Sequence, residues 1–113
     1  GTIGLVNLQA VLEAHPGLPA AQSEFQQAVT EMEQELATAE EQEQQMLAGQ
    51  FQQMLAHLVQ ELQNQLFDDI MAAVETVSVR GGYSLVVDEG AVLFGGDDLT
   101  QDIIGQLLSD LDG

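Results

Sequence analysis

The sequence predicts an α+β fold, in which a small β-rich body is joined to a long antiparallel coiled-coil helical hairpin that forms an arm. Short β-branched apolar runs lie near both ends of the 113-residue chain, as in short buried strands. Between Pro19 and Val79 there is no further proline, and apolar residues recur at heptad spacing among Gln, Glu and Ala. We therefore expect residues 1–18 and 80–113 to form the body and residues 19–79 to form the arm.

The N-terminal part of the body is expected to contain a strand, a short helix and a hinge. Residues 2–8, TIGLVNL, are short, apolar and β-branched, which is typical of a buried strand. Residues 9–15 can form one or two helical turns that end at His15, because proline disfavours helical backbone in the residue before it. Gly17 then provides a hinge, and Pro19 suits the first position of the next helix.

Two apolar series follow the predicted arm with steps of three, four or seven residues. The first comprises Phe25, Val29, Met32, Leu36, Ala39 and Met46, and the second Phe51, Leu55, Leu58, Leu62, Leu66, Ile70, Ala73 and Val77. Periodicity alone fits one continuous helix as well as two helices, because the two series can be joined. A hairpin is favoured because two helices of about 30 residues, rising about 1.5 Å per residue, return the chain to its first strand. We place the turn near Ala48–Gln50, since Gly49 is unfavourable inside a helix.

The chain after the arm is expected to form two paired strands. The segment Arg80–Gly82 should end the returning helix, because glycine adopts the left-handed cap and a cation suits the negative helix end. Residues 83–88 and 91–95 are apolar and flank Glu89–Gly90, which indicates a β-hairpin.

A final helix is expected after this hairpin. Asp98 is a candidate cap, and Gln101 lies three residues later, as in a capping box. The apolar face of the helix would comprise Ile103, Ile104, Leu107, Leu108 and Leu111.

Three short strands do not make a self-sufficient sheet, because small domains bury too little surface alone. Joining the strands of several chains around a symmetry axis removes open edges and covers apolar strand residues. We therefore expect the body to be completed by oligomerisation. The residues expected to be buried there are Ile3, Leu5, Leu85, Val87, Val92 and Phe94.

The charge balance excludes several classes of function. The chain has 19 Asp and Glu residues, one Arg and no Lys, which gives a formal net charge of −18. Affinity for nucleic acids and anionic membranes comes mainly from Lys and Arg, so we expect no nucleic-acid partner. Hydrophobic residues make up 45% of the chain, too many for a disordered acidic tail, so it should fold.

The sequence offers no convincing catalytic or metal site. Zero Cys excludes disulfides, thiol catalysis and thiolate ligands. His15 and His57 lie 42 residues apart without zinc-ligand spacing, and no serine has the context of a nucleophile elbow. We therefore expect no enzyme activity, no catalytic residues, no metal and no cofactor.

Two sequence blocks carry a resemblance to a known family. The block IGLVNLQAVLEAHPGLPAAQSEF (3–25) and the block GYSLVVDEGAVLFGGDDLTQDIIGQL (82–107) resemble the two ends of the Skp/OmpH family of periplasmic chaperones. The resemblance implies a homotrimer whose strands build a central body and whose helical arms enclose a cavity. It also implies an ATP-independent holdase for unfolded outer-membrane proteins. The expected location is the periplasm, as a mature chain from which the signal peptide is absent.

The chain departs from that family in its arm. The predicted arm of about 60 residues is shorter than in the best-known members. Family arms are often rich in Lys and Arg, whereas this arm has neither between Pro19 and Val79. The resemblance therefore does not extend to lipid or lipopolysaccharide binding.

Apolar residues crowd near the predicted tip of the arm, where those off the seam are expected to remain exposed. They are Met46, Leu47, Phe51, Met54, Leu55 and Val59. Methionine adapts to varied apolar partners, and an exposed apolar patch normally marks a binding surface. These residues can cap the hairpin alone, or cap it and also contact clients. The alternative to the holdase is accordingly a structural coiled-coil module that oligomerises or spaces partners without chaperone activity.

Overall fold

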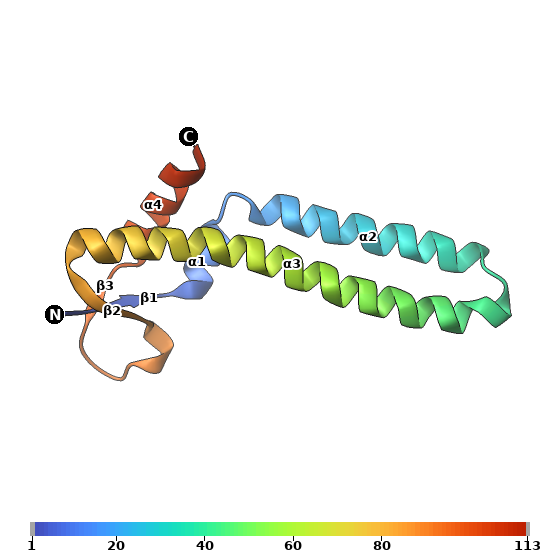
Figure 1. Cartoon of the computed structure of the whole chain (residues 1–113), viewed down its shortest axis with the longest axis horizontal. Coiled ribbons are helices and arrows are strands. Elements are labelled where there is room, and N and C mark those ends of the chain that lie inside the picture. The colour runs from blue at the N-terminus through green and yellow to red at the C-terminus, as the bar shows by residue number, and fades with distance from the viewer. Residues whose placement is uncertain (1, 113) are drawn as a thin grey trace. The chain divides into compact units, whose positions relative to one another are not determined.

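The computed structural model describes residues 2–112 and places a three-stranded sheet and four α-helices in the chain (Figure 1). In chain order the elements are β1 (Thr2–Val6), α1 (Leu8–Ala14), α2 (Leu18–Thr38), α3 (Glu41–Gly81), β2 (Tyr83–Asp88), a 3₁₀ turn (Glu89–Ala91), β3 (Asp97–Asp98) and α4 (Thr100–Asp112). The predicted α+β class is therefore confirmed, with a long helix and a small sheet.

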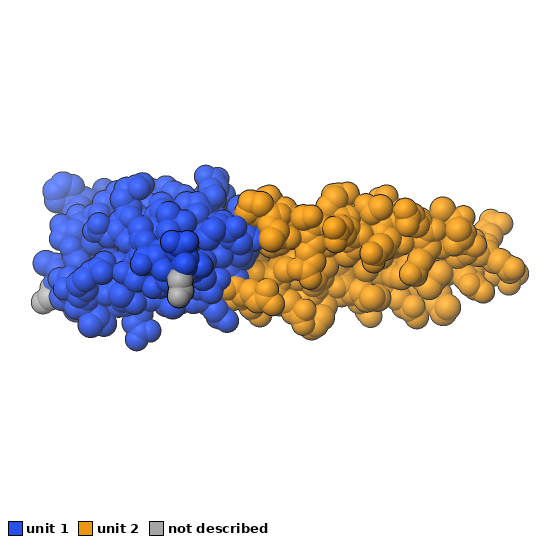
Figure 2. Space-filling model, turned by 90° about the horizontal axis from the view of Figure 1, so that it is seen from above, with its two compact units in different colours: residues 1–18, 66–113 blue, residues 19–65 orange. Residues whose placement is uncertain are grey.

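The chain divides into two compact units (Figure 2). One unit, which we call the body, contains residues 1–18 and 66–113, and the other, which we call the arm, contains residues 19–65. Helix α3 continues through both units, so its last turns from Leu66 onward belong to the body. The sequence instead placed residues 66–79 in the arm, because the apolar series gives no sign of where one unit ends.

The body sheet has the order β2-β1-β3, and both outer strands run parallel to β1. Residues 83–88 form β2 as predicted, but the predicted β-hairpin with residues 91–95 is wrong. The chain instead makes a 3₁₀ turn and a loop, and then Asp97–Asp98 pairs with the free edge of β1. Parallel strands cannot be joined by a tight turn, which is why the connection between β2 and β3 is long.

One face of the sheet lies on the hydrophobic core of the body. Val6 of β1 is buried there, and Val86 of β2 packs against the same cluster. The helices contribute the other buried members: Val11 from α1, Ile70, Ala73 and Val77 from α3, and Ile103 and Leu107 from α4, with Leu99 just before it. The last part of the second apolar series, from Ile70 onward, is thus enclosed in the core of this unit.

Hydrogen bonds at the helix ends explain several boundaries of the body. The Asn7 side chain accepts from the Ala10 N–H at 3.0 Å and so caps α1. At the other end of that helix His15 has extended backbone, as predicted for a residue before proline. Helix α3 ends at Gly81, and Gly82 follows with a φ of +70°, the left-handed conformation that glycine adopts most easily.

In the arm, α2 and the first part of α3 run side by side in opposite directions (Figure 1). The predicted turn near Ala48–Gln50 is wrong, because the helices are interrupted at Ala39–Glu40 and Gly49 lies inside α3. The Gln44 amide donates to the Leu36 carbonyl at 3.1 Å, which satisfies an orphan acceptor at the end of α2. Glu41 and Glu43 occupy the first turn of α3, where negative charge is favourable.

Candidate functional site

The face of the body sheet that points away from the core is apolar and open. Ile3 lies beside Leu85, and Leu5 lies beside Val87, in the parallel register of β1 and β2. Ile3 and Leu85 are about half exposed, and Leu5 and Val87 are partly buried. These four residues therefore form an apolar sheet face that other elements of the single chain cover only in part.

The loop between β2 and β3 adds further apolar surface. Leu93 and Phe94 are essentially fully exposed, and Val92 is partly buried. Val92 and Phe94 were expected within a strand, but the structure places them in the loop. The six residues predicted to complete the body thus remain partly or fully accessible in one chain.

Side-chain hydrogen bonds link the two outer strands of this sheet and connect β3 to the start of α4. The Tyr83 hydroxyl on β2 donates to Asp97 Oδ2 on β3 at 3.0 Å. This hydrogen bond raises the pKa of Tyr83 above its ordinary value, because an ionised phenol would lie beside a carboxylate. Asp98 Oδ1 accepts from both the backbone N–H and the hydroxyl of Thr100, which lowers the pKa of Asp98. Asp98 does bond the start of α4, but its partner is Thr100, the first residue of the helix, and not Gln101 of the predicted capping box.

His15 ends α1 in the body and is buried. Its Nε2 lies 2.9 Å from Asp69 Oδ2, and its Nδ1 accepts from the Gly17 N–H at 2.8 Å. Because Nδ1 accepts, the ring proton of the neutral side chain is on Nε2 and points at the carboxylate. Both ring nitrogens are therefore used in contacts within the body, which indicates a structural role for this histidine.

The six predicted client-binding residues lie on α3 but do not gather at its turn. Met46 and Val59 are 13 residues apart, which is about 20 Å along a helix. Their burial also differs: Phe51 is nearly buried, Leu47 and Leu55 are partly buried, and Met46, Met54 and Val59 are exposed.

Two of the six predicted residues line a groove of about 390 Å³ on the arm. We call it the arm groove. Its apolar lining is Ala28 and Met32 of α2 with Phe51, Met54 and Leu58 of α3, and its polar lining is Glu31, Glu35, His57 and Glu61. Sequence reasoning missed Met32 and Leu58 as site residues, because it assigned these two seam positions to helix packing. The signal that could have found them is the row of glutamates that flanks this part of the seam.

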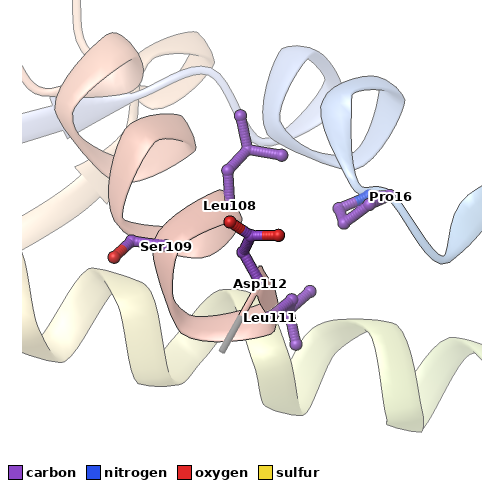
Figure 3. Close-up of a pocket in the computed structure, with 5 residues that line it drawn as sticks. All are labelled: Pro16, Leu108, Ser109, Leu111 and Asp112. Atoms are coloured by element: carbon purple, nitrogen blue, oxygen red, sulfur yellow. The ribbon is translucent and has the colours of Figure 1, made fainter.

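A second hollow, of about 420 Å³, lies in the body at the end of α4 (Figure 3). Leu108 and Leu111 of α4 line it together with Pro16, and Ser109 and Asp112 are its polar members. One hydroxyl and one carboxylate, without a histidine or an amine in the lining, do not make an activated nucleophile. We assign no chemistry to this hollow.

Within residues 2–112 no three His, Asp or Glu side chains come together in a way that could hold a metal ion. None of the helices described is long and apolar enough to cross a membrane.

The comparisons with known proteins add one match. The sequence model of the OmpH-like outer membrane protein family matches residues 38–107, which is more than half of the chain. The match includes all of α3, β2 and β3, and it contains the whole of the sequence block 82–107. It confirms the resemblance inferred from the sequence. No curated protein matches the chain.

Proposed function

The chain belongs to the OmpH-like family, and from this premise we propose that it is an ATP-independent holdase that keeps unfolded outer-membrane proteins from aggregating. Membership of the family indicates a periplasmic chaperone-type role. The single observation that carries the finer proposal is the arm groove, where apolar side chains stay accessible on a helical pair. Such a surface suits weak, reversible contact with apolar client segments.

The open apolar face of the body sheet supports an oligomeric holdase. Ile3, Leu5, Leu85 and Val87 form this face, and Phe94 is exposed in the adjoining loop. A face of this kind, repeated around a three-fold axis, would be buried against itself in a homotrimer. Three arms would then surround a space in which a client is held.

The negative charge of the chain supports release of a client as well as holding it. Residues 19–65 contain no Lys or Arg, so a loaded complex would carry negative charge along every arm. Like charges resist association between loaded complexes and favour many weak contacts over one tight contact. The same absence of cations argues against binding to lipopolysaccharide or anionic lipid.

The test is suppression of aggregation. An unfolded β-barrel protein is diluted from denaturant without nucleotide, and its light scattering is followed with and without one trimer equivalent of the chain. We expect scattering to fall in the presence of the chain and to be unaffected by added ATP. No suppression at any salt concentration would contradict the holdase and leave a structural coiled-coil module.

A second measurement tests the assembly. Multi-angle light scattering at micromolar concentration should give the mass of three chains, and Leu85→Glu should shift it to one chain. Ser84→Glu is the matched control, because Ser84 is an exposed neighbour on the same strand whose side chain is polar. A monomeric wild-type chain would remove the cavity and the mechanism with it.

A further inference from the structure

The arm groove has an apolar base beneath an open methionine. Phe51 is 8% exposed, whereas Met54, one helical turn later on α3, is 57% exposed. Met32 and Leu58, both partly buried, complete the apolar lining from the two helices. A volume of about 390 Å³ lies at the small end of the roughly 300–1,000 Å³ of ligand pockets. The groove therefore has room for one or two bulky side chains and not for a folded element.

Carboxylates stand on both walls of this groove. Glu31 and Glu35 belong to α2, and Glu61 belongs to α3. The only nearby group that can carry positive charge is His57, whose Nε2 lies 3.0 Å from Glu61 Oε1. No Lys or Arg occurs anywhere in residues 19–65, so the negative charge of the rim is not balanced by a fixed cation.

An apolar base with a carboxylate rim selects for one kind of occupant. We infer that the arm groove binds client segments in which a bulky apolar side chain stands one or two residues from Lys or Arg. The apolar side chain would cover Phe51 and Met54, and the cation would reach Glu31 or Glu35. Long cationic side chains suit this place because their methylene stems pack on apolar surface while the charged end stays in water.

The inference rests on the proposed function and narrows it to a class of client segment. Exposed ion pairs contribute little energy each, so the rim should act mainly on the choice between segments. A segment with Asp or Glu beside the same apolar side chain would be repelled by three carboxylates. The arm therefore discriminates by charge, and apolar contact supplies most of the affinity.

Another surface of the arm lacks this combination, and one exposed methionine on α3 lies outside the groove. A shallow hollow on α2 is lined by Ser23, Gln26, Gln27, Thr30, Glu31 and Gln34, and contains no apolar side chain. Met46 is as exposed as Met54 and lies on the same helix, but it does not line the groove. Met46→Ala is thus a matched control for Met54→Ala.

The experiment measures binding of two labelled peptides to the full chain by fluorescence anisotropy. The peptides share a Phe and a Leu and differ only in two neighbouring residues, which are Lys in one and Glu in the other. At 0.05 M salt we expect the Lys peptide to bind at least tenfold more tightly. The difference should shrink to less than about threefold at 1 M salt, where the Debye length falls to about 3 Å.

The variants locate the site. The double variant Glu31→Gln/Glu35→Gln should weaken the Lys peptide about three- to tenfold and leave the Glu peptide unchanged or bound more tightly. Met54→Ala should weaken the Lys peptide, whereas Met46→Ala should not. Equal affinity for both peptides, or an equal loss with both methionine variants, would overturn the inference.

The same proteins are assayed for suppression of β-barrel aggregation, so that the two proposals fail separately. Suppression without peptide discrimination leaves the holdase and removes the groove specificity. Discriminating peptide binding without any suppression leaves a peptide-binding groove and removes the holdase. Helical circular dichroism of each variant must match the wild-type spectrum, which excludes loss of folding as the cause.

Discussion

The body and the arm use the same helix α3 in two different ways. In the body, Ile70, Ala73 and Val77 of α3 are buried, because α1, α4 and the sheet pack around them. In the arm, all of whose residues 19–65 are described, Phe51 is the one apolar side chain that is nearly buried. Two helices side by side cover only a strip of each other, whereas a helix and a sheet between further helices enclose a core.

This difference in burial predicts that the body is the more stable unit and that the arm leaves apolar side chains accessible. Seam residues of α2 such as Phe25, Val29 and Leu36 are partly buried, and none is fully buried. Local openings are easiest where few apolar contacts are enclosed, so the arm should open at lower free energy than the body. The same incomplete packing leaves the arm groove accessible.

The largest expected effect comes from emptying the body core. Ile103 is fully buried, so Ile103→Ala should lower the free energy of unfolding by about 2–5 kcal/mol. Leu36→Ala in the arm removes a partly buried side chain and should cost less than half as much. Urea unfolding at one fixed protein concentration measures both values. Equal losses would contradict the contrast between a closed core and an open seam.

Proline substitutions in the arm test where its two helices end. Ala48 lies inside α3, so Ala48→Pro should cost about 3 kcal/mol or more. Glu41 is the first residue of α3, where proline is tolerated, so Glu41→Pro should change stability little. Hydrogen exchange should show faster exchange in the arm for Ala48→Pro and unchanged protection at Ile70 and Ile103. A larger loss of stability in Glu41→Pro than in Ala48→Pro would indicate that the turn lies near Gly49.

The sequence could predict the elements because their signals are local. Partly buried Met32 and buried Leu107 lie where the three- and four-residue spacing placed them. The turn of the arm was misplaced because Gly49 is a stronger local sign of a break than Ala39–Glu40. That break depends on capping by Gln44 and on acidic residues at the start of α3, which periodicity does not detect.

The third strand and the arm groove could not be predicted, because both depend on contacts between residues that are far apart in the sequence. The run 91–95 has strand composition, but the free edge of β1 is taken by Asp97–Asp98. Parallel pairing joins residues far apart in sequence, so no local pattern encodes it. Likewise, Met32 and Met54 share a groove only because the turn sets how α2 lies along α3. An error of about nine residues in the turn changes every such pair.

A smaller effect concerns the start of α4 in the body. Asp98→Ala removes the acceptor for the Thr100 N–H and should cost about 0.5–2 kcal/mol, near the lower value because Asp98 is exposed. The pKa of Asp98 is lowered in the folded chain, so its carboxylate stabilises the fold above the ordinary pKa of about 3.9. That stabilisation is lost as the pH falls through the lowered pKa. Asp98→Asn keeps an acceptor oxygen without the titration, so its unfolding free energy should depend less on pH between about 2 and 5.

The smallest expected effect is an increase in stability when a helical glycine is replaced by alanine. At Gly49 the sign of this change distinguishes helical backbone from a turn with positive φ. A Cβ added at Gly49 would meet no atom within 4 Å, and the same holds for Gly105 inside α4. Gly49→Ala and Gly105→Ala should each stabilise the helix concerned by up to about 1 kcal/mol, because alanine loses less backbone entropy there. Thermal unfolding and hydrogen exchange together measure the gain and its place. For Gly49→Ala added protection should be confined to the arm, and for Gly105→Ala it should reach the body core. A loss of stability in Gly49→Ala alone would mean that Gly49 occupies a turn with positive φ, and α3 would then begin later than Glu41.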